Sequence, residues 1–188
     1  MNILVIKSSV FGDNGNSSSL VNSQLAALQA QHPDATVVVR DLSTDPIPHL
    51  DGERVGAFFT PADQRSDDQQ AVDAFSMALI DELKTADHIV LGLPMYNFGI
   101  PSQLKSWIDH VARAGITFRY TENGPQGLLD DKPVTVLAAR GGLYAGTEND
   151  TVTPYIKLIF GFIGMTDVNF VYAEGLNMGC LLYTSDAA

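Results

Sequence analysis

Short apolar runs alternate with amphipathic segments along most of the chain, a pattern that favours alternating strands and helices. The runs are brief and rich in β-branched residues, as in strands buried on both faces; they occupy residues 3–6, 36–39, 88–93, 134–138 and 168–171. The intervening segments repeat apolar residues at spacings of three and four, and helices are expected within residues 16–32, 72–86, 104–111 and 151–164. The pattern predicts an α/β fold, a three-layer sandwich around a five-stranded parallel sheet.

Five parallel strands suit the flavodoxin-like strand order 2-1-3-4-5, in which ligands bind beyond the carboxyl ends of the strands. The loops after the first, third and fourth strands are therefore expected to hold the functional site. Residues 41–68 contain scattered prolines, glycines and acids. This length is unusual for a structureless connection, so a functional or interface loop is expected there.

The first of these loops, residues 9–18, carries small hydroxyl residues and glycines and leads directly into a predicted helix. Backbone N–H groups at a helix start can bind phosphate without a basic side chain. The loop lacks both G-x-G-x-x-G and G-x-x-x-x-G-K-[ST], so a monophosphate fits better than a pyrophosphate or triphosphate. The alternative interpretation is an ordinary capped turn.

The other two loops offer surfaces suited to a flat ring. Residues 94–101 place Tyr96, Asn97 and Phe98 after the third strand, and Gly141-Gly142 follows the fourth. An isoalloxazine ring needs apolar contacts and a few hydrogen bonds to its pyrimidine edge. Core packing for the aromatic residues and a simple turn for the glycines are the alternatives.

Residues 93–128, which read LPMYNFGIPSQLKSWIDHVARAGITFRYTENGPQGL, resemble the bacterial FMN-dependent NADH-azoreductases and NAD(P)H:quinone oxidoreductases. Arg140-Gly141-Gly142, Thr153-Pro154-Tyr155 and residues 161–164 match the same family, and the resemblance spans residues 1–179.

The resemblance implies cofactor-binding residues in three groups. The FMN phosphate is expected at Ser9, Gly15, Asn16 and Ser17. The flavin ring is expected along Met95, Tyr96, Asn97 and Phe98, with its pyrimidine side at Arg140, Gly141 and Gly142. Gly15 and Ala139 depart from the family pattern, because hydroxyl residues are common at both positions. Each departure is expected to remove one polar contact.

A flavin carries the redox chemistry itself, so no catalytic side chain is expected. The resemblance implies a ping-pong cycle in which NADH or NADPH supplies electrons and a quinone or azo compound accepts them, azo bonds being cleaved to amines. Phe118 and Phe162 are expected to line the substrate slot, with Phe58 or Phe59 of the partner subunit in a homodimer. The helix within residues 151–164 is apolar on several faces, which also favours a dimer. A flavodoxin-type electron carrier is the alternative function.

Composition narrows the possible partners and compartment. Lys and Arg total 11 against 22 Asp and Glu, giving a formal net charge of −11. This charge disfavours binding to nucleic acids and anionic membranes. No signal-peptide pattern or long apolar run appears, and Cys180 is the only cysteine, so a cytoplasmic protein without an intramolecular disulfide or a cysteine nucleophile is expected. The four histidines lack metal-site spacing, so no metal is expected.

The chain end predicts a boundary between a flavodoxin-like FMN-binding domain at residues 1–179 and an atypical tail at residues 180–188. Family members continue with a charged amphipathic helix, which the tail is too short to replace. We interpret the tail as non-native sequence after a truncated reading frame. The chain is then expected to aggregate readily or to depend on FMN and dimerisation.

Overall fold

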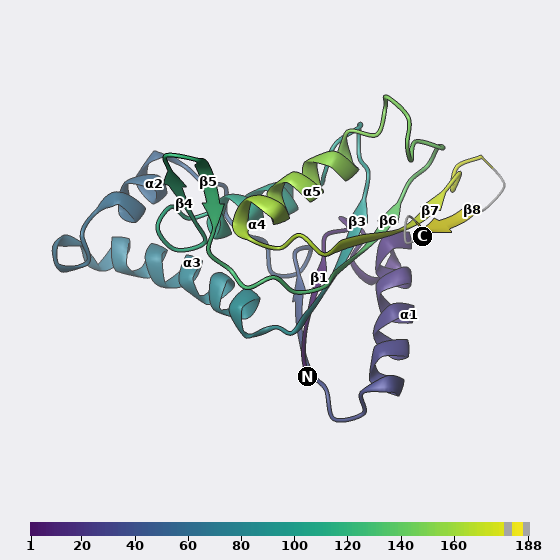
Figure 1. Cartoon of the computed structure of the whole chain (residues 1–188), viewed down its shortest axis with the longest axis horizontal. Helices are drawn as coiled ribbons and strands as arrows, with labels where there is room; N and C mark the ends of the chain where they lie inside the picture. The colour runs from purple at the N-terminus through teal and green to yellow at the C-terminus, as the bar shows by residue number, and fades with distance from the viewer. Residues whose placement is uncertain (179–181, 186–188) are drawn as a thin grey trace.

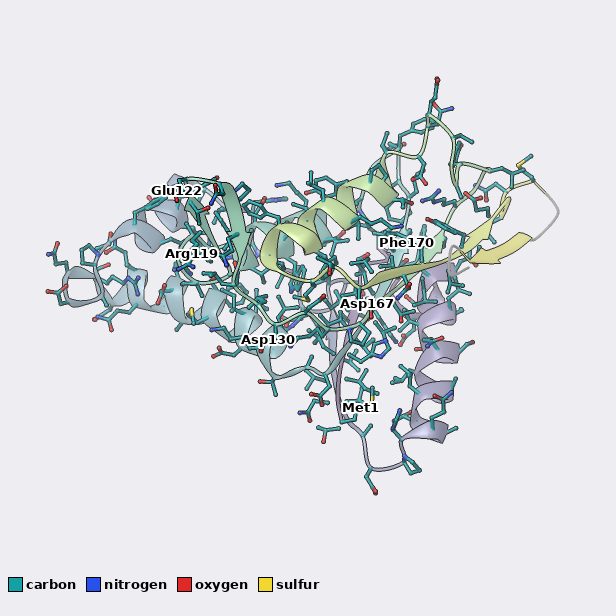
Figure 2. The ribbon with its side chains drawn as sticks, in the orientation of Figure 1. Met1, Arg119, Glu122, Asp130, Asp167 and Phe170 are labelled. Atoms are coloured by element: carbon teal, nitrogen blue, oxygen red, sulfur yellow. The ribbon has the colours of Figure 1, made fainter. Side chains whose placement is uncertain are left out.

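The computed structural model describes residues 1–178 and 182–185, and a parallel sheet forms its centre (Figure 1). The five parallel strands lie in the order β2-β1-β3-β6-β7. Their bounds are Thr36–Asp41 (β2), Asn2–Lys7 (β1), His88–Pro94 (β3), Val134–Ala139 (β6) and Val168–Glu174 (β7). The predicted order 2-1-3-4-5 is therefore confirmed. Met1 and Asp167, each just before a parallel strand, mark the amino end of the sheet (Figure 2).

Helices cover both faces of the sheet, as the predicted sandwich requires. Figure 1 shows α1 on one face and α3, α4 and α5 on the other. Their bounds are Asn16–Gln31 (α1), Asp67–Thr85 (α3), Ser102–Val111 (α4) and Val152–Ile163 (α5). The larger apolar cluster includes Leu79, Trp107 and Phe160, whereas the smaller one lies under Val21 and Leu28 of α1. The core thus lies mostly on the side of α3, α4 and α5.

The four predicted helices all form, but their ends differ from expectation. The second begins at Asp67 rather than near residue 72, because Ser66 and Gln69 form a reciprocal capping box at its start. At its other end, the Lys132 ammonium donates hydrogen bonds to the carbonyls of Leu83, Lys84 and Ala86 at 2.9, 3.1 and 2.6 Å. These contacts satisfy carbonyls that a helix end leaves without partners.

Several short elements were not predicted. The expected long loop at residues 41–68 contains α2 (Gly52–Phe59) and a 3₁₀ turn, η2 (Ala62–Gln64), and a second 3₁₀ turn, η1 (Gly12–Asn14), lies in the first loop. The strands β4 (Phe118–Thr121) and β5 (Gly124–Gly127) form an antiparallel hairpin. Glycines disfavour both helix and strand, so Gly52, Gly56 and Gly124 conceal these elements from a pattern analysis.

The end of the described chain adds an antiparallel strand to the sheet. β8 (Leu182–Ser185) pairs with β7, with Tyr172 opposite Thr184. The sequence pattern did not predict this strand. Cys180 and the proposed boundary at residue 179 lie outside the described residues. No helix within the described ranges is long and apolar enough to cross a membrane.

Candidate functional site

A hollow of about 200 Å³ lies where four parallel strands end. The loops after β1, β3, β6 and β7 line it, as expected for a ligand site at the carboxyl edge of a parallel sheet. Its lining residues are Ser9, Phe11, Gly15, Asn16, Ser17, Pro94, Met95, Tyr96, Ala139, Arg140, Gly141, Leu176 and Asn177. The structure therefore brings eight of the eleven predicted cofactor residues to one hollow, and leaves Asn97, Phe98 and Gly142 outside its lining.

The first loop ends in a polar group that lacks a partner. Gly15 is the residue before α1, and Ser17 lies in the first turn of that helix. The Ser17 side chain is 1% exposed, and its hydroxyl has no hydrogen-bond partner within the described part of the chain. Buried hydroxyls are normally hydrogen-bonded, and helix N-termini attract anions. This arrangement fits a phosphate group.

Ser9 occupies the space that a side chain at position 15 would need. A Cβ atom on Gly15 would lie 2.1 Å from Ser9 Oγ and 2.6 Å from Ser9 Cβ. Ser9 Oγ accepts a hydrogen bond from the Phe11 backbone at 3.2 Å and lies 3.3 Å from the Tyr96 hydroxyl. The chain thus combines a glycine at 15 with a serine hydroxyl, from the loop after β1, directed at the same space.

The second loop contains a tight turn with strained backbone. Tyr96 and Gly99 exchange backbone hydrogen bonds of 3.0 and 2.9 Å across Asn97 and Phe98. Those two residues have φ angles of +50° and +58°, in the left-handed region that side chains disfavour. Such strain persists only where surrounding contacts enforce it, and it often marks a ligand site.

Contacts from a neighbouring loop hold this turn in place. The Thr151 hydroxyl donates a hydrogen bond to the Phe98 carbonyl. The Phe98 ring packs edge-on against Tyr144, with ring centroids 5.5 Å apart. The loops after β3 and β6 are therefore coupled beside the hollow.

The third loop places the Arg140 side chain below the hollow. Its guanidinium donates to Asp150 at 2.9 Å, to the Thr153 hydroxyl at 2.7 Å and to Glu174 at 3.3 Å. Burial alone would raise the pKa of Asp150, yet hydrogen bonds from Thr153 and the Arg140 guanidinium outweigh it and hold the pKa below its ordinary value of 3.8. The two terminal guanidinium nitrogens of Arg140 are thus engaged by protein groups, whereas its buried Nε has no hydrogen-bond partner among the described residues.

The predicted substrate residues lie apart from the hollow within one chain. The ring centroids of Phe118 and Phe162 are 4.2 Å apart, where the β4–β5 hairpin meets α5. Phe58 is half-buried at the end of α2, under the Arg113 guanidinium at 3.7 Å, and Phe59 beside it is 78% exposed. None of the four lines the hollow.

Sequence reasoning missed the contribution of the last parallel strand. Leu176 and Asn177 line the hollow. The Asn177 side chain lies so close to Gly141 that a Cβ atom at position 141 would be only 2.5 Å from Asn177 Nδ2. The signal was available, because residues that follow β7 reach the same carboxyl edge as the three predicted loops.

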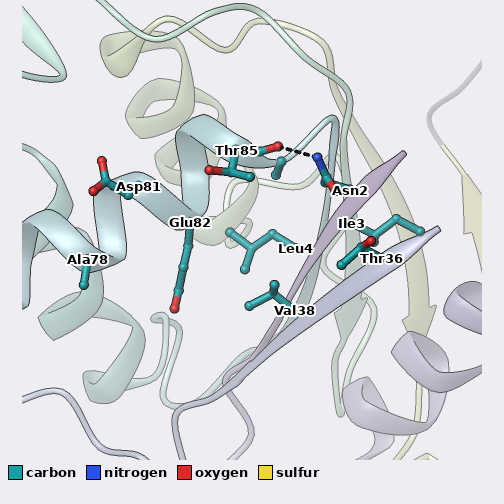
Figure 3. A pocket seen from close by; sticks show the side chains of 10 residues that line it. Asn2, Ile3, Leu4, Thr36, Val38, Ala78, Asp81, Glu82 and Thr85 are labelled. Carbon is teal, nitrogen blue, oxygen red and sulfur yellow. Dashed lines mark hydrogen bonds between the residues drawn. The ribbon is translucent and has the colours of Figure 1, made fainter.

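A larger hollow of about 440 Å³ lies elsewhere (Figure 3). It is formed between β2 and the last turns of α3, at the amino end of β1, where Asn2 Nδ2 donates to the Thr85 carbonyl at 3.2 Å. Leu4, Val38 and Ala78 give it an apolar lining. Its position at the amino edge and the lack of converging loops make the smaller hollow the better candidate.

The comparisons with known proteins agree with this geometry. Residues 1–181 match the profile of a family described as having a flavodoxin-like fold. The chain belongs to this flavodoxin-like family. Relatives with the name FMN-dependent NADH:quinone oxidoreductase include the following two. The protein from Alcanivorax borkumensis is 85% identical over 95% of this chain and 90% of its own length, and that from Cellvibrio japonicus is 56% identical over 94% and 89%.

Solved structures similar to this chain include azoreductases. The azoreductase AzrA superposes with a TM-score of 0.86 at 30% identity, covering 95% of this chain and 89% of that chain. An FMN-dependent NADH-azoreductase from Bacillus anthracis, solved in complex with FMN, has a TM-score of 0.84 at 26% identity, with coverage of 94% and 89%.

Proposed function

We propose that this protein is an FMN-dependent oxidoreductase that transfers electrons from NADH or NADPH to quinones and to azo compounds. One observation carries the proposal: the loops after four parallel strands meet at a hollow that contains a buried Ser17 hydroxyl at a helix start, with no hydrogen-bond partner among the described residues. The names of the relatives support the same chemistry.

The residues of the hollow divide by the part of FMN that each would hold. Asn16 and Ser17 suit the phosphate, because their backbone N–H groups and the Ser17 hydroxyl lie at the start of α1, whereas the Gly15 N–H already donates to the Gly12 carbonyl at 3.1 Å. Met95, Tyr96 and Gly141 suit the ring, with the turn at residues 97–98 beside it. When bound, FMN supplies the electron-transfer chemistry, and the protein orients it and leaves a face open to substrates.

If bound FMN has one face open to substrates, the electron donor and the acceptor must use it in turn, which gives a ping-pong order. NADH or NADPH binds and leaves before a flat acceptor enters the same slot. Neither order nor donor preference requires a catalytic side chain, since the chain's role is to position the reactants. The proposal includes a cytoplasmic location, where both nucleotides are available.

A homodimer completes this proposal. Phe59 on α2 is 78% exposed and Leu158 on α5 is 68% exposed, although both are large apolar residues. Burying such side chains stabilises an interface. Phe118, Phe162 and Phe58 or Phe59 of the partner subunit would then border the substrate slot.

The test is anaerobic mixing of the FMN-loaded protein with NADH or NADPH. We expect direct bleaching of the flavin absorbance, and parallel lines in steady-state plots against a quinone. Intersecting lines would contradict the ping-pong order. Failure of both nucleotides to reduce the flavin would favour the flavodoxin-type electron carrier, and sedimentation of an active monomer would contradict the dimer.

A further inference from the structure

A buried group of three charged side chains lies next to the loops after β3 and β6, which the proposed function assigns to the flavin ring. We refer to Arg140, Asp150 and Glu174 as the Arg140 cluster. Their side chains are 1%, 6% and 10% exposed, and Arg140 bonds to both carboxylates. One positive charge faces two negative charges. Burying such a group offers little net stability over apolar packing, so its presence calls for another reason.

Glu174 supports the loop after β6 directly. One of its oxygens, Oε1, accepts hydrogen bonds from the backbone N–H groups of Tyr144 at 2.8 Å and Ala145 at 2.9 Å, and from Arg140 at 3.3 Å. A single carboxylate at the end of β7 therefore fixes both ends of the segment 140–145.

The residues after Glu174 fasten the same loop along its backbone. The N–H groups of residues 175, 176 and 177 donate to the carbonyls of residues 142, 140 and 141 at 3.1, 3.2 and 3.0 Å. The segment 140–142 thus lies between β7 and the hollow with its carbonyls already satisfied.

Asp150 extends this support to the turn at residues 96–99. Asp150 accepts from the Thr153 backbone at 3.0 Å, which fixes the first turn of α5. The adjacent Thr151 donates to the Phe98 carbonyl, and Tyr144, which Glu174 holds, packs on the Phe98 ring. The Thr151 hydrogen bond and the Tyr144 ring contact therefore both hold Phe98, one of the two residues with left-handed backbone beside the hollow.

We propose that Glu174 is a positioning residue that, through the Arg140 cluster, holds segments 140–145 and 96–99 in their FMN-binding arrangement before the cofactor binds. This inference rests on the proposed function, since it takes these segments as the flavin-binding loops. Ordering loops in advance lowers the entropic cost of binding and so increases affinity. The same contacts explain how Asn97 and Phe98 are held in the left-handed conformation.

The chain offers a matched control. Asp73 on α3 accepts from the buried Arg113 guanidinium at 2.8 Å, within a second, partly buried ionic group whose hydrogen bonds among the described residues do not involve residues 96–99 or 140–145. Asp73→Asn removes the charge of a partly buried carboxylate, 19% exposed, as Glu174→Gln removes that of a 10% exposed one, and Asp73 does not line the hollow. A purely structural role for Glu174 predicts equal behaviour of the two variants.

The experiment measures the FMN dissociation constant and the exchange of the Tyr144 and Ala145 amide hydrogens in the apoprotein. We expect Glu174→Gln, which keeps an acceptor oxygen, to weaken FMN binding about tenfold, and Glu174→Met to weaken it more, with faster exchange at both amides. Asp73→Asn should lower the unfolding midpoint and leave the dissociation constant unchanged.

The outcomes separate the two levels of the proposal. Wild-type protein that does not bind FMN contradicts the proposed function and this inference with it. Wild-type binding with an unchanged dissociation constant in Glu174→Gln, or equal weakening in Asp73→Asn, overturns the positioning role alone. If Glu174→Met does not fold, Glu174→Gln decides the question.

Discussion

Two buried arginines, Arg140 and Arg113, have similar chemistry and different surroundings. Arg140 pairs with Asp150 and Glu174, so one positive charge meets two carboxylates. Arg113 shares Asp73 with Arg65, so two positive charges meet one carboxylate. We refer to Arg65, Asp73 and Arg113 as the Arg113 cluster.

The two clusters connect different parts of the molecule. The Arg140 cluster holds backbone of the loop after β6, whereas Arg113 lies over the Phe58 ring and donates to Ser76 on α3 at 2.8 Å. The Arg113 cluster therefore ties α2 and α3 to the end of α4. A buried ion pair takes its role from what it holds, and only the first cluster holds loops at the carboxyl edge.

The largest expected difference comes from removing each arginine. Arg140→Met leaves two buried carboxylates without their shared positive charge and should lower the free energy of unfolding by about 3–5 kcal/mol. Arg113→Met should cost less, about 2 kcal/mol, because Asp73 keeps Arg65 at 2.6 Å. Urea unfolding of the apoproteins measures both values. Equal losses would show that the charge balance of the clusters is irrelevant.

A smaller effect should follow from changing Phe58, the ring beneath Arg113. Phe58→Ala removes this contact and the apolar anchor of α2, so we expect a loss of about 2 kcal/mol, below the range for a fully buried ring. Phe59→Ala is the matched control at protein concentrations where the chain is monomeric, because Phe59 is 78% exposed in the single chain and should there change the free energy of unfolding by less than about 0.5 kcal/mol. A similar loss in both variants would contradict the anchoring role of Phe58.

The smallest effect is a pH dependence on the Arg113 side of the molecule. His110 is fully buried, and its Nε2 donates to the Pro48 carbonyl at 3.0 Å, which leaves Nδ1 without a partner among the described residues. Burial, aided by nearby Arg54 and Arg113, lowers the pKa of His110 below 6.5, against the opposing effects of Pro48 and Asp109.

Because the folded-state pKa lies below the unfolded one, the stabilisation is complete above about pH 6.5 and is lost as the pH falls through the folded-state pKa. His110→Gln can keep a donor to Pro48 without titrating in this range. Its free energy of unfolding should therefore decline less than that of wild type between about pH 7 and pH 5. Parallel declines would assign the pH dependence to other groups.

The sequence predicted the sheet well because buried parallel strands are continuously apolar, and strand ends then locate the site. It could not predict α2, since the helix contains Gly52 and Gly56 and is anchored by tertiary contacts of Phe58. The role of the Arg140 guanidinium was also out of reach, because its partner Glu174 lies 34 residues away in sequence. Long-range ionic contacts leave no periodic signal.

The most direct test of the account is amide hydrogen exchange of the protein with and without saturating FMN. We predict protection by FMN in residues 9–17, 95–99 and 140–145, which form or adjoin the hollow at the carboxyl edge, and no change around Asn2, Val38 and Ala78 at the larger hollow. Protection confined to the larger hollow, or absent from all three loops, would contradict the placement of the flavin site.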